Sequence, residues 1–386
     1  YVGALENGKL QAQRLRTDRR SRSPRYYYSE YDHELSPTWS PDGAELIFVT
    51  NPETAYGTGG LWRAALSGGG AMKPVRIEET TWKARPDWNP DGKRVVYSSY
   101  LGRQWHQLWI TTATGGEPFA LTYGDFDATG ARWSPDGNHI AYLSNESGNN
   151  QLWILDLSRG GARKPLLQDE RKFLRPHGRL ELHIRDANGK PVPARVAVRD
   201  TAGRYFNGID AWVYAADGFD RGNAAATFRY FHSDGESMLD VPAGKYSVTV
   251  WRGLEHHIIR QAVNVVAGQS ASLTLKSENL HLPKSWSEWS SGDLHVHMNY
   301  GGTYRNTPER LVRQAAAEDL DMVYNLVVNK EQRIPDIAYF STQPDAASTD
   351  GVLVLHGQEF HTTLWGHLGL LGLSDHFLIP DYAAYP

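Results

Sequence analysis

The sequence predicts a multidomain protein made of a partial all-β propeller, a β-sandwich and the beginning of an α/β barrel. Three observations lead to this prediction. A W-[SN]-P-D-G motif recurs before residue 167, alternating strand patterns fill residues 179–280, and strands alternate with helices from residue 281 onward. A chain of 386 residues is long enough for two or three domains of roughly 100–200 residues each.

The composition narrows the classes of function. A formal net charge of -4 gives no positive field for nucleic acid or an anionic membrane, so we expect neither partner. No apolar run approaches the roughly 20 residues that cross a bilayer, so we expect no membrane span. The chain has no cysteine, and any metal must therefore be held by His, Asp, Glu or Asn. Because the chain starts at Tyr1 and not at Met, we expect it to be part of a longer protein.

The first part of the chain, residues 1–167, contains three copies of one strand–turn–strand unit: Pro37–Thr50, Pro86–Ser99 and Ala131–Ser144. In each motif Pro sets φ, Asp bonds nearby backbone, and Gly accepts the positive φ that closes the turn. A repeat of roughly 40–50 residues built from short strands is typical of propeller blades. The units resemble the blades of TolB-like propellers, so we expect a partial propeller with further blades elsewhere in the natural protein.

Residues 168–178 are charged and aperiodic and are expected to be a linker. Residues 179–280 alternate apolar and polar positions around Asn188-Gly189, which predicts a small β-sandwich. The stretches "GKPVPA" and "VPAGKYSVTV" resemble transthyretin-like carboxypeptidase regulatory domains. That resemblance implies a stabilising or carbohydrate-contacting module and an extracytoplasmic protein, either periplasmic or secreted.

Residues 281–386 change to strand–helix alternation. "GDLHVH" predicts a strand, and residues 307–320 predict a helix with Thr307 as N-cap and Pro308 in its first turn. Residues 321–328 and 351–360 predict two further buried strands. This order is typical of a parallel sheet or a (β/α) barrel.

Histidines and a carboxylate follow two of these strands. His295 and His297 have the i,i+2 spacing that places both on one face of a strand. The later segment "HGQEFHTTLWGH" supplies His356, Glu359, His361 and His367. An isolated H-x-H is more often a pair of solvated histidines, but two strands that end in such residues favour a site for Zn²⁺, Mn²⁺ or Fe²⁺.

These residues resemble the metal-dependent hydrolases of the polymerase-and-histidinol-phosphatase (PHP) type, most closely the branch related to carbaryl hydrolase, in which "G-D-L-H-x-H" is the first metal motif. The resemblance implies a truncated PHP-like barrel in residues 281–386. Its metal ligands are His295, His297, Glu359 and His367. It gives catalytic roles to Glu359, as a proton acceptor, and to His361.

One departure from the family pattern lies in the middle strand. The family has an Asp and a His where this chain has Val327 and Val328, and Glu331 is the only anionic substitute nearby. The leading hypothesis is a metal-activated water that attacks an ester, amide, carbamate or phosphoester. The substrate would be a small molecule or peptide-like, with the propeller contacting substrate, protein or glycan. The alternative is a non-catalytic propeller and sandwich binding protein with a degenerate metal domain. A propeller-gated serine peptidase would need a G-x-S-x-G elbow, which the sequence lacks.

Overall fold

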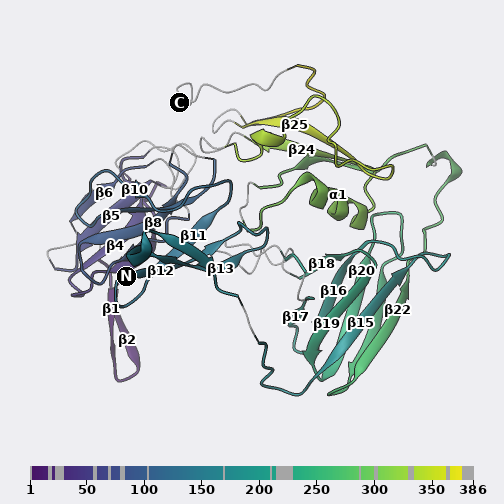
Figure 1. The fold of residues 1–386 in the computed structure, drawn as a ribbon, viewed down its shortest axis with the longest axis horizontal. Coiled ribbons are helices and arrows are strands. Elements are labelled where there is room, and N and C mark those ends of the chain that lie inside the picture. Colours follow the sequence, from purple (N-terminus) through teal and green to yellow (C-terminus); the bar gives the residue numbers. More distant parts are fainter. Residues whose placement is uncertain are drawn as a thin grey trace.

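A computed structural model gives the fold of the chain (Figure 1). The structure describes residues 2–15, 20–21, 30–54, 59–67, 71–78, 83–101, 104–167, 170–208, 211–213, 229–286, 288–299, 303–328, 334–361 and 366–375.

The first part of the chain forms three four-stranded antiparallel sheets in sequence order (Figure 1). The first sheet contains β3 (Glu34–Trp39), β4 (Glu45–Thr50), β5 (Gly60–Ala65) and β6 (Met72–Arg76). The second contains β7 (Asp87–Trp88), β8 (Arg94–Ser99), β9 (Gln107–Thr112) and β10 (Phe119–Ala120). The third contains β11 (Ala128–Trp133), β12 (His139–Ser144), β13 (Gln151–Asp156) and β14 (Ala162–Pro165). A separate hairpin of β1 (Val2–Glu6) and β2 (Lys9–Gln13) precedes them.

The repeated motif forms the same turn in each sheet. In the first copy, Ser40 Oγ donates to Asp42 Oδ1 at 2.6 Å, and the Gly43 N–H donates to the Ser40 carbonyl at 2.9 Å. Gly43 has a φ of 71°, which glycine adopts without the steric cost that other residues incur. The glycines of the other two copies have φ values of 73° and 71°. The local chemistry of the motif therefore accounts for the hairpin in each blade.

Apolar side chains fill the spaces between successive sheets. Ile47 and Leu61 of the first sheet share a buried cluster with Trp88 and Tyr97 of the second. Residues of the second and third sheets share another cluster that includes Val96 and Ile140. The repeats are therefore stacked blades, as the sequence predicts.

The next unit consists of two further sheets that share one buried cluster. One sheet has the order β19-β15-β22, with β15 (His177–Arg185), β19 (Glu236–Pro242) and β22 (Ser270–Lys276). The other contains β16 (Ala194–Asp200), β17 (Tyr205–Phe206), β18 (Phe231–Ser233), β20 (Gly244–Trp251) and β21 (Ile259–Val265). Side chains such as Leu182, Val196 and Val248 are fully buried between them. We refer to these strands as the two-sheet unit. Its membership in the carboxypeptidase regulatory family stays a prediction.

The last unit is one four-stranded sheet with the order β23-β24-β25-β26. Its strands are β23 (Gly292–Val296), β24 (Met322–Val328), β25 (Leu353–His361) and β26 (His367–Leu370). Helix α1 (Pro308–Ala317) connects β23 to β24 and starts as predicted, with Thr307 Oγ1 accepting a hydrogen bond from the Arg310 N–H. The described residues also form three 3₁₀ helices: η1 (Leu157–Arg159), η2 (Lys284–Trp286) and η4 (Ile337–Tyr339).

The predicted PHP-like (β/α) barrel fragment is wrong. Strands β23, β24 and β25 are parallel, but β26 is antiparallel to β25, and α1 is the one α-helix in the described part of residues 281–386. The physical reason is the connection after β25. A parallel crossover needs a dozen or more residues, whereas only residues 362–366 separate β25 from β26. The chain therefore returns as a hairpin.

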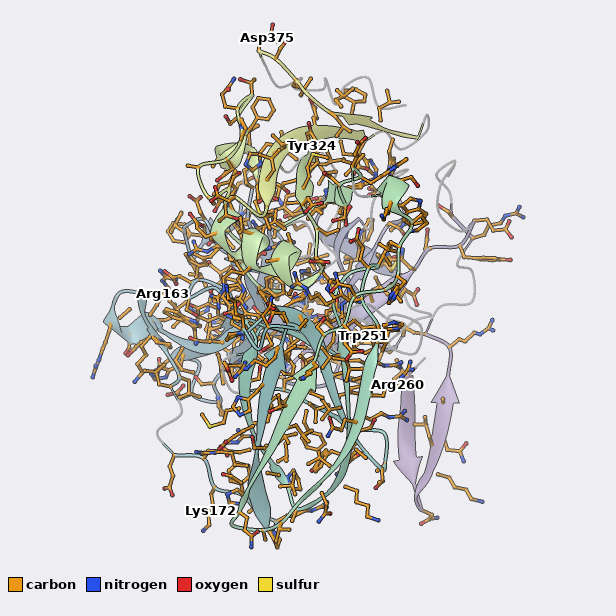
Figure 2. The ribbon with its side chains drawn as sticks, turned by 90° about the vertical axis from the view of Figure 1, so that its right-hand side faces the viewer. Arg163, Lys172, Trp251, Arg260, Tyr324 and Asp375 are labelled. Carbon is orange, nitrogen blue, oxygen red and sulfur yellow. The ribbon has the colours of Figure 1, made fainter. Side chains whose placement is uncertain are left out.

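The last sheet and the two-sheet unit contact each other through α1. Glu318 at the end of α1 accepts hydrogen bonds from Arg195 Nε at 2.6 Å and from His232 Nε2 at 2.7 Å. Figure 2 shows Tyr324 of β24 and Lys172 toward opposite ends of the molecule, with Trp251 of β20 between them. This interface places α1 over the end of the two-sheet unit.

Candidate metal centre

Glu359 is the centre of the candidate site. It lies on β25, and only 4% of its side chain is exposed. Its Oε2 lies 2.9 Å from His295 Nε2 and 2.6 Å from His297 Nε2. Its Oε1 lies 2.7 Å from Nδ1 of His367 on β26. Three imidazoles therefore surround one buried carboxylate.

The contacts of His297 require a proton or a cation between its ring and Glu359. Its Nδ1 lies 2.7 Å from the carbonyl oxygen of Leu326, which can only accept, so Nδ1 carries a proton. In the neutral ring Nε2 then has only a lone pair, and it faces a carboxylate oxygen of Glu359. Two lone pairs repel each other at 2.6 Å, so the contact needs either a proton shared between the ring and the carboxyl group or a cation. A backbone carbonyl that orients the far nitrogen is also the usual partner of a metal-bound histidine.

Two groups of side chains in the described residues have the spacing of a metal site, and they share Glu359. The first is His295, His297 and Glu359, and the second is Glu359, His361 and His367. Within each group the ligand atoms lie within 4.8 Å of one another. The second group depends on the hairpin, since His361 and His367 are paired residues of β25 and β26. The residues present therefore fit a divalent ion with nitrogen and oxygen ligands.

The charge balance favours an ionised Glu359. Burial raises the pKa of this carboxyl, but the hydrogen bond with His295 and the nearby His297 and His367 lower it more, and its pKa lies below the usual value. An anionic carboxylate in a nearly enclosed position is the form that binds a cation.

Strand β24 contributes apolar side chains beside Glu359, and its described residues supply no ligand there. Val327 and Val328 of β24 are buried, and Val328 is the register partner of Glu359. The predicted substitute Glu331 lies outside the described residues. The valines that the sequence shows in place of Asp and His are therefore part of the sheet core.

The structure brings together all four predicted ligands, His295, His297, Glu359 and His367, and places His361 beside them. His356 is separate. Its Nε2 lies 2.8 Å from Asp345 Oδ2, and its side chain is fully buried. The i,i+2 spacing predicted that His295 and His297 share a face, and the family resemblance added Glu359 and His367, whereas the contacts among the strands needed the sheet order.

The comparisons with known proteins identify the first part of the chain. A family model described as "TolB beta propeller domain" matches residues 16–205. The match extends past the third blade into β15, β16 and β17, which belong to the two-sheet unit. The chain therefore contains a TolB-like β-propeller domain.

Two curated relatives and one solved structure are similar to parts of the chain. The chain is 29% identical over 120 residues to the Tol-Pal system protein TolB of Anaeromyxobacter dehalogenans (strain 2CP-C), with 31% of this chain and 27% of the relative aligned. It is 30% identical over 107 residues to "Uncharacterized peptidase YuxL" of Bacillus subtilis (strain 168), with 27% and 16% aligned. The chain thus spans less than a third of the length of either relative. The crystal structure of TolB from Acinetobacter baumannii matches with a TM-score of 0.31 at 18% identity, over 57% of this chain and 51% of that one.

These findings correct the predicted function. The family model that matches is the TolB β-propeller domain, and the relatives include proteins named TolB. The described part of residues 281–386 has one α-helix and an antiparallel last strand, which is not a (β/α) barrel. The prediction of a PHP-type metal-dependent hydrolase is therefore wrong, and the small-molecule substrate that depended on it has no support. Metal binding by His295, His297, Glu359 and His367 and catalytic roles for Glu359 and His361 stay predictions. Among the described residues, no helix is both long and apolar enough to cross a membrane.

Proposed function

We propose that this protein is a non-catalytic binding protein whose TolB-like blades present a surface to a partner protein. The observation that carries the proposal is the match of the blades to the TolB β-propeller domain. Several relatives are named Tol-Pal system protein TolB, so a Pal-type protein is the partner to test first. An extracytoplasmic location, periplasmic or secreted, belongs to the same proposal.

The buried polar groups of the blades support binding rather than catalysis. His106 Nδ1 lies 3.1 Å from Asp127 Oδ1, and the Asp127 N–H donates to Asn145 Oδ1 at 2.7 Å. Glu78 likewise accepts hydrogen bonds from Tyr97 and from Ser99. These groups hold neighbouring segments of the blades together, which is a structural use of polar side chains.

Exposed aromatic side chains are the natural contact points of the blades. Trp39, Phe119 and Tyr123 are each half exposed or more. Aromatic residues are enriched at protein interfaces and often account for much of the binding energy.

The experiment is surface plasmon resonance of the whole chain against a purified Pal-type protein. We expect binding that at least one of Trp39→Ser, Phe119→Ser and Tyr123→Ser weakens about tenfold or more. Leu174→Ser, which replaces an apolar side chain that is 93% exposed and lies outside the blades, is the control. Absence of binding, or equal loss with Leu174→Ser, would contradict the proposal.

We also propose that the histidine–glutamate cluster binds one or two divalent ions, Zn²⁺, Mn²⁺ or Fe²⁺, in a structural role. The support is the set of ligand atoms around Glu359 and the proton or cation that the contact between His297 and Glu359 requires. Such an ion would connect β23, β25 and β26. Without it, β24 separates β23 from β25, and β25 is joined to β26 by the hydrogen bonds of the sheet.

Element analysis of the purified protein tests the metal site. We expect bound metal that the double variant His295→Ala with His297→Ala removes. His257→Ala with His281→Ala, two exposed histidines outside the cluster, should leave the metal content unchanged. A metal content that is the same in both double variants would refute the site.

A further inference from the structure

A second candidate site lies between the two-sheet unit and helix α1, away from the histidine–glutamate cluster. A cavity of about 450 Å³ is lined there by residues of both, including Trp212, Met238, Arg310 and Arg313. Its size is within the range of small-molecule sites.

Arg310 is the unusual residue of this cavity. Its guanidinium stacks over the ring of Trp212, 3.2 Å from the ring centroid. Its Nε is buried and has no hydrogen-bond partner, and no described carboxylate forms an ion pair with it. Burial, the largest effect, and the like charge of Arg313 lower the pKa of Arg310 to about 10. A half-buried guanidinium that lacks a counter-ion is costly, and an anion would relieve that cost.

The other charges of the cavity have partners within the protein. Arg179 Nε lies 3.2 Å from Asp240 Oδ1, and Arg313 forms an ion pair with Asp234. Glu236 forms ion pairs with residues of β15. Three arginines and three carboxylates line the cavity, and Arg310 is the one of them that forms no ion pair in the described part of the chain; the charge of Asp234 acts on it only from beyond ion-pair distance. A single anion beside Arg310 would supply the ion pair that it lacks.

The indole ring of Trp212, on which Arg310 stacks, contacts two other parts of the protein. Its ring centroid lies 5.3 Å from that of Tyr304. The ring also passes so close to a blade turn that a Cβ on Gly148 would lie 2.7 Å from it. These contacts hold the Trp212 ring in position without a ligand, and this lowers the conformational entropy that is lost on binding.

We propose that this cavity binds a small organic carboxylate, with the carboxylate paired to Arg310 and the apolar body against Trp212 and Met238. The guanidinium presents N–H donors in a fork that matches a carboxylate. A monoanion fits better than a phosphate dianion, because the carboxylates of Asp234 and Asp240 also line the cavity. This site does not depend on the proposed partner or on the metal.

Isothermal titration calorimetry with benzoate tests the proposal, with benzamide as the neutral ligand of nearly the same shape. We expect benzoate to bind the whole chain and benzamide to bind about tenfold more weakly or not at all. Arg310→Met keeps a long side chain but removes the charge, and should weaken benzoate binding about tenfold or more. The control Trp286→Ala removes an exposed aromatic residue outside the cavity and should leave binding unchanged.

Thermal denaturation separates a ligand site from a structural role. Arg310→Met removes a half-buried charge that forms no ion pair with a described residue, but it also removes the cation–π contact with Trp212, so its melting temperature should stay close to that of the parent protein. The proposal is overturned if benzoate does not bind, if benzamide binds equally well, or if Arg310→Met keeps full benzoate binding. Binding of inorganic phosphate but not of benzoate would overturn the assignment to an organic carboxylate.

Discussion

The tryptophans of the repeated motif provide a direct test of the blade packing. Trp88 and Trp39 occupy the same position in successive repeats, but Trp88 is 7% exposed and Trp39 is 50% exposed. Burial of a tryptophan removes roughly 150–250 Å² from water, which corresponds to about 4–6 kcal/mol. The Trp88→Ala variant loses nearly all of this burial and leaves a cavity beside Ile47 and Tyr97.

The expected magnitudes follow from the exposures. We expect Trp88→Ala to lower the free energy of unfolding by about 3–5 kcal/mol. The lower part of that range is favoured, because the Trp88 indole N–H is buried and bonds to no other described residue, and its loss is favourable. Trp39→Ala removes a half-exposed ring without creating an enclosed cavity, and should cost about 1–2 kcal/mol.

The measurement is native-state hydrogen exchange at amides of β4 and β8, the central strands on either side of the packed cluster. It reports local opening and so does not require the whole multidomain chain to unfold in one step. Trp39→Ala is the matched control for Trp88→Ala. Equal effects of the two substitutions would show that the blades are not stacked as described.

Two further predictions concern the last unit. Burial raises the pKa of Glu318, but the hydrogen bond from His232 and a neighbouring guanidinium lower it more, and its pKa lies below the usual value. A carboxylate with a lowered pKa stabilises the fold above its unfolded-state pKa of about 4.3, and that stability is lost as the pH falls through the lower folded-state value. The melting temperature should therefore fall more between about pH 5 and 3 for the parent protein than for Glu318→Gln, and parallel pH profiles would refute the ion pair. Gly357→Ala places a Cβ 2.7 Å from the backbone oxygen of Leu370 and should destabilise the β25–β26 hairpin by about 1–3 kcal/mol. Gly351→Ala meets no atom within 4 Å and should change little in the same urea titration, so similar losses in the two variants would contradict the described packing.

The incorrect prediction of a metallohydrolase has an identifiable cause. His295, His297 and Glu359 lie together in the structure, but a group of potential ligands does not specify a fold or a reaction. The short connection of residues 362–366 excludes a crossover helix, and this could have been noticed in the sequence. Val327 and Val328 of β24 also argue against the metallohydrolase family. They occupy the strand between β23 and β25, at the positions where that family has an Asp and a His.

The cavity beside Arg310 could not be predicted from the sequence. Arg310 lies on the first turn of a correctly predicted helix, where an arginine is ordinarily solvated. Trp212 lies in a segment between β17 and β18 that has no periodic pattern. Their contact joins residues from different units of the chain, and nothing local to either position indicates it.

The sequence by itself determined the hairpins of the blades, the start of α1 at Thr307 and the shared face of His295 and His297. Each depends on backbone angles and hydrogen bonds among neighbouring residues, which a short motif specifies. Only the tertiary structure decided which repeat tryptophan is buried and that Glu359 contacts two histidines that lie across β24. It also decided that Arg310 Nε is buried without a hydrogen-bond partner among the described residues. These features depend on the order of strands in a sheet and on the docking of separate units, and they join residues whose distance along the chain carries no information about their contact.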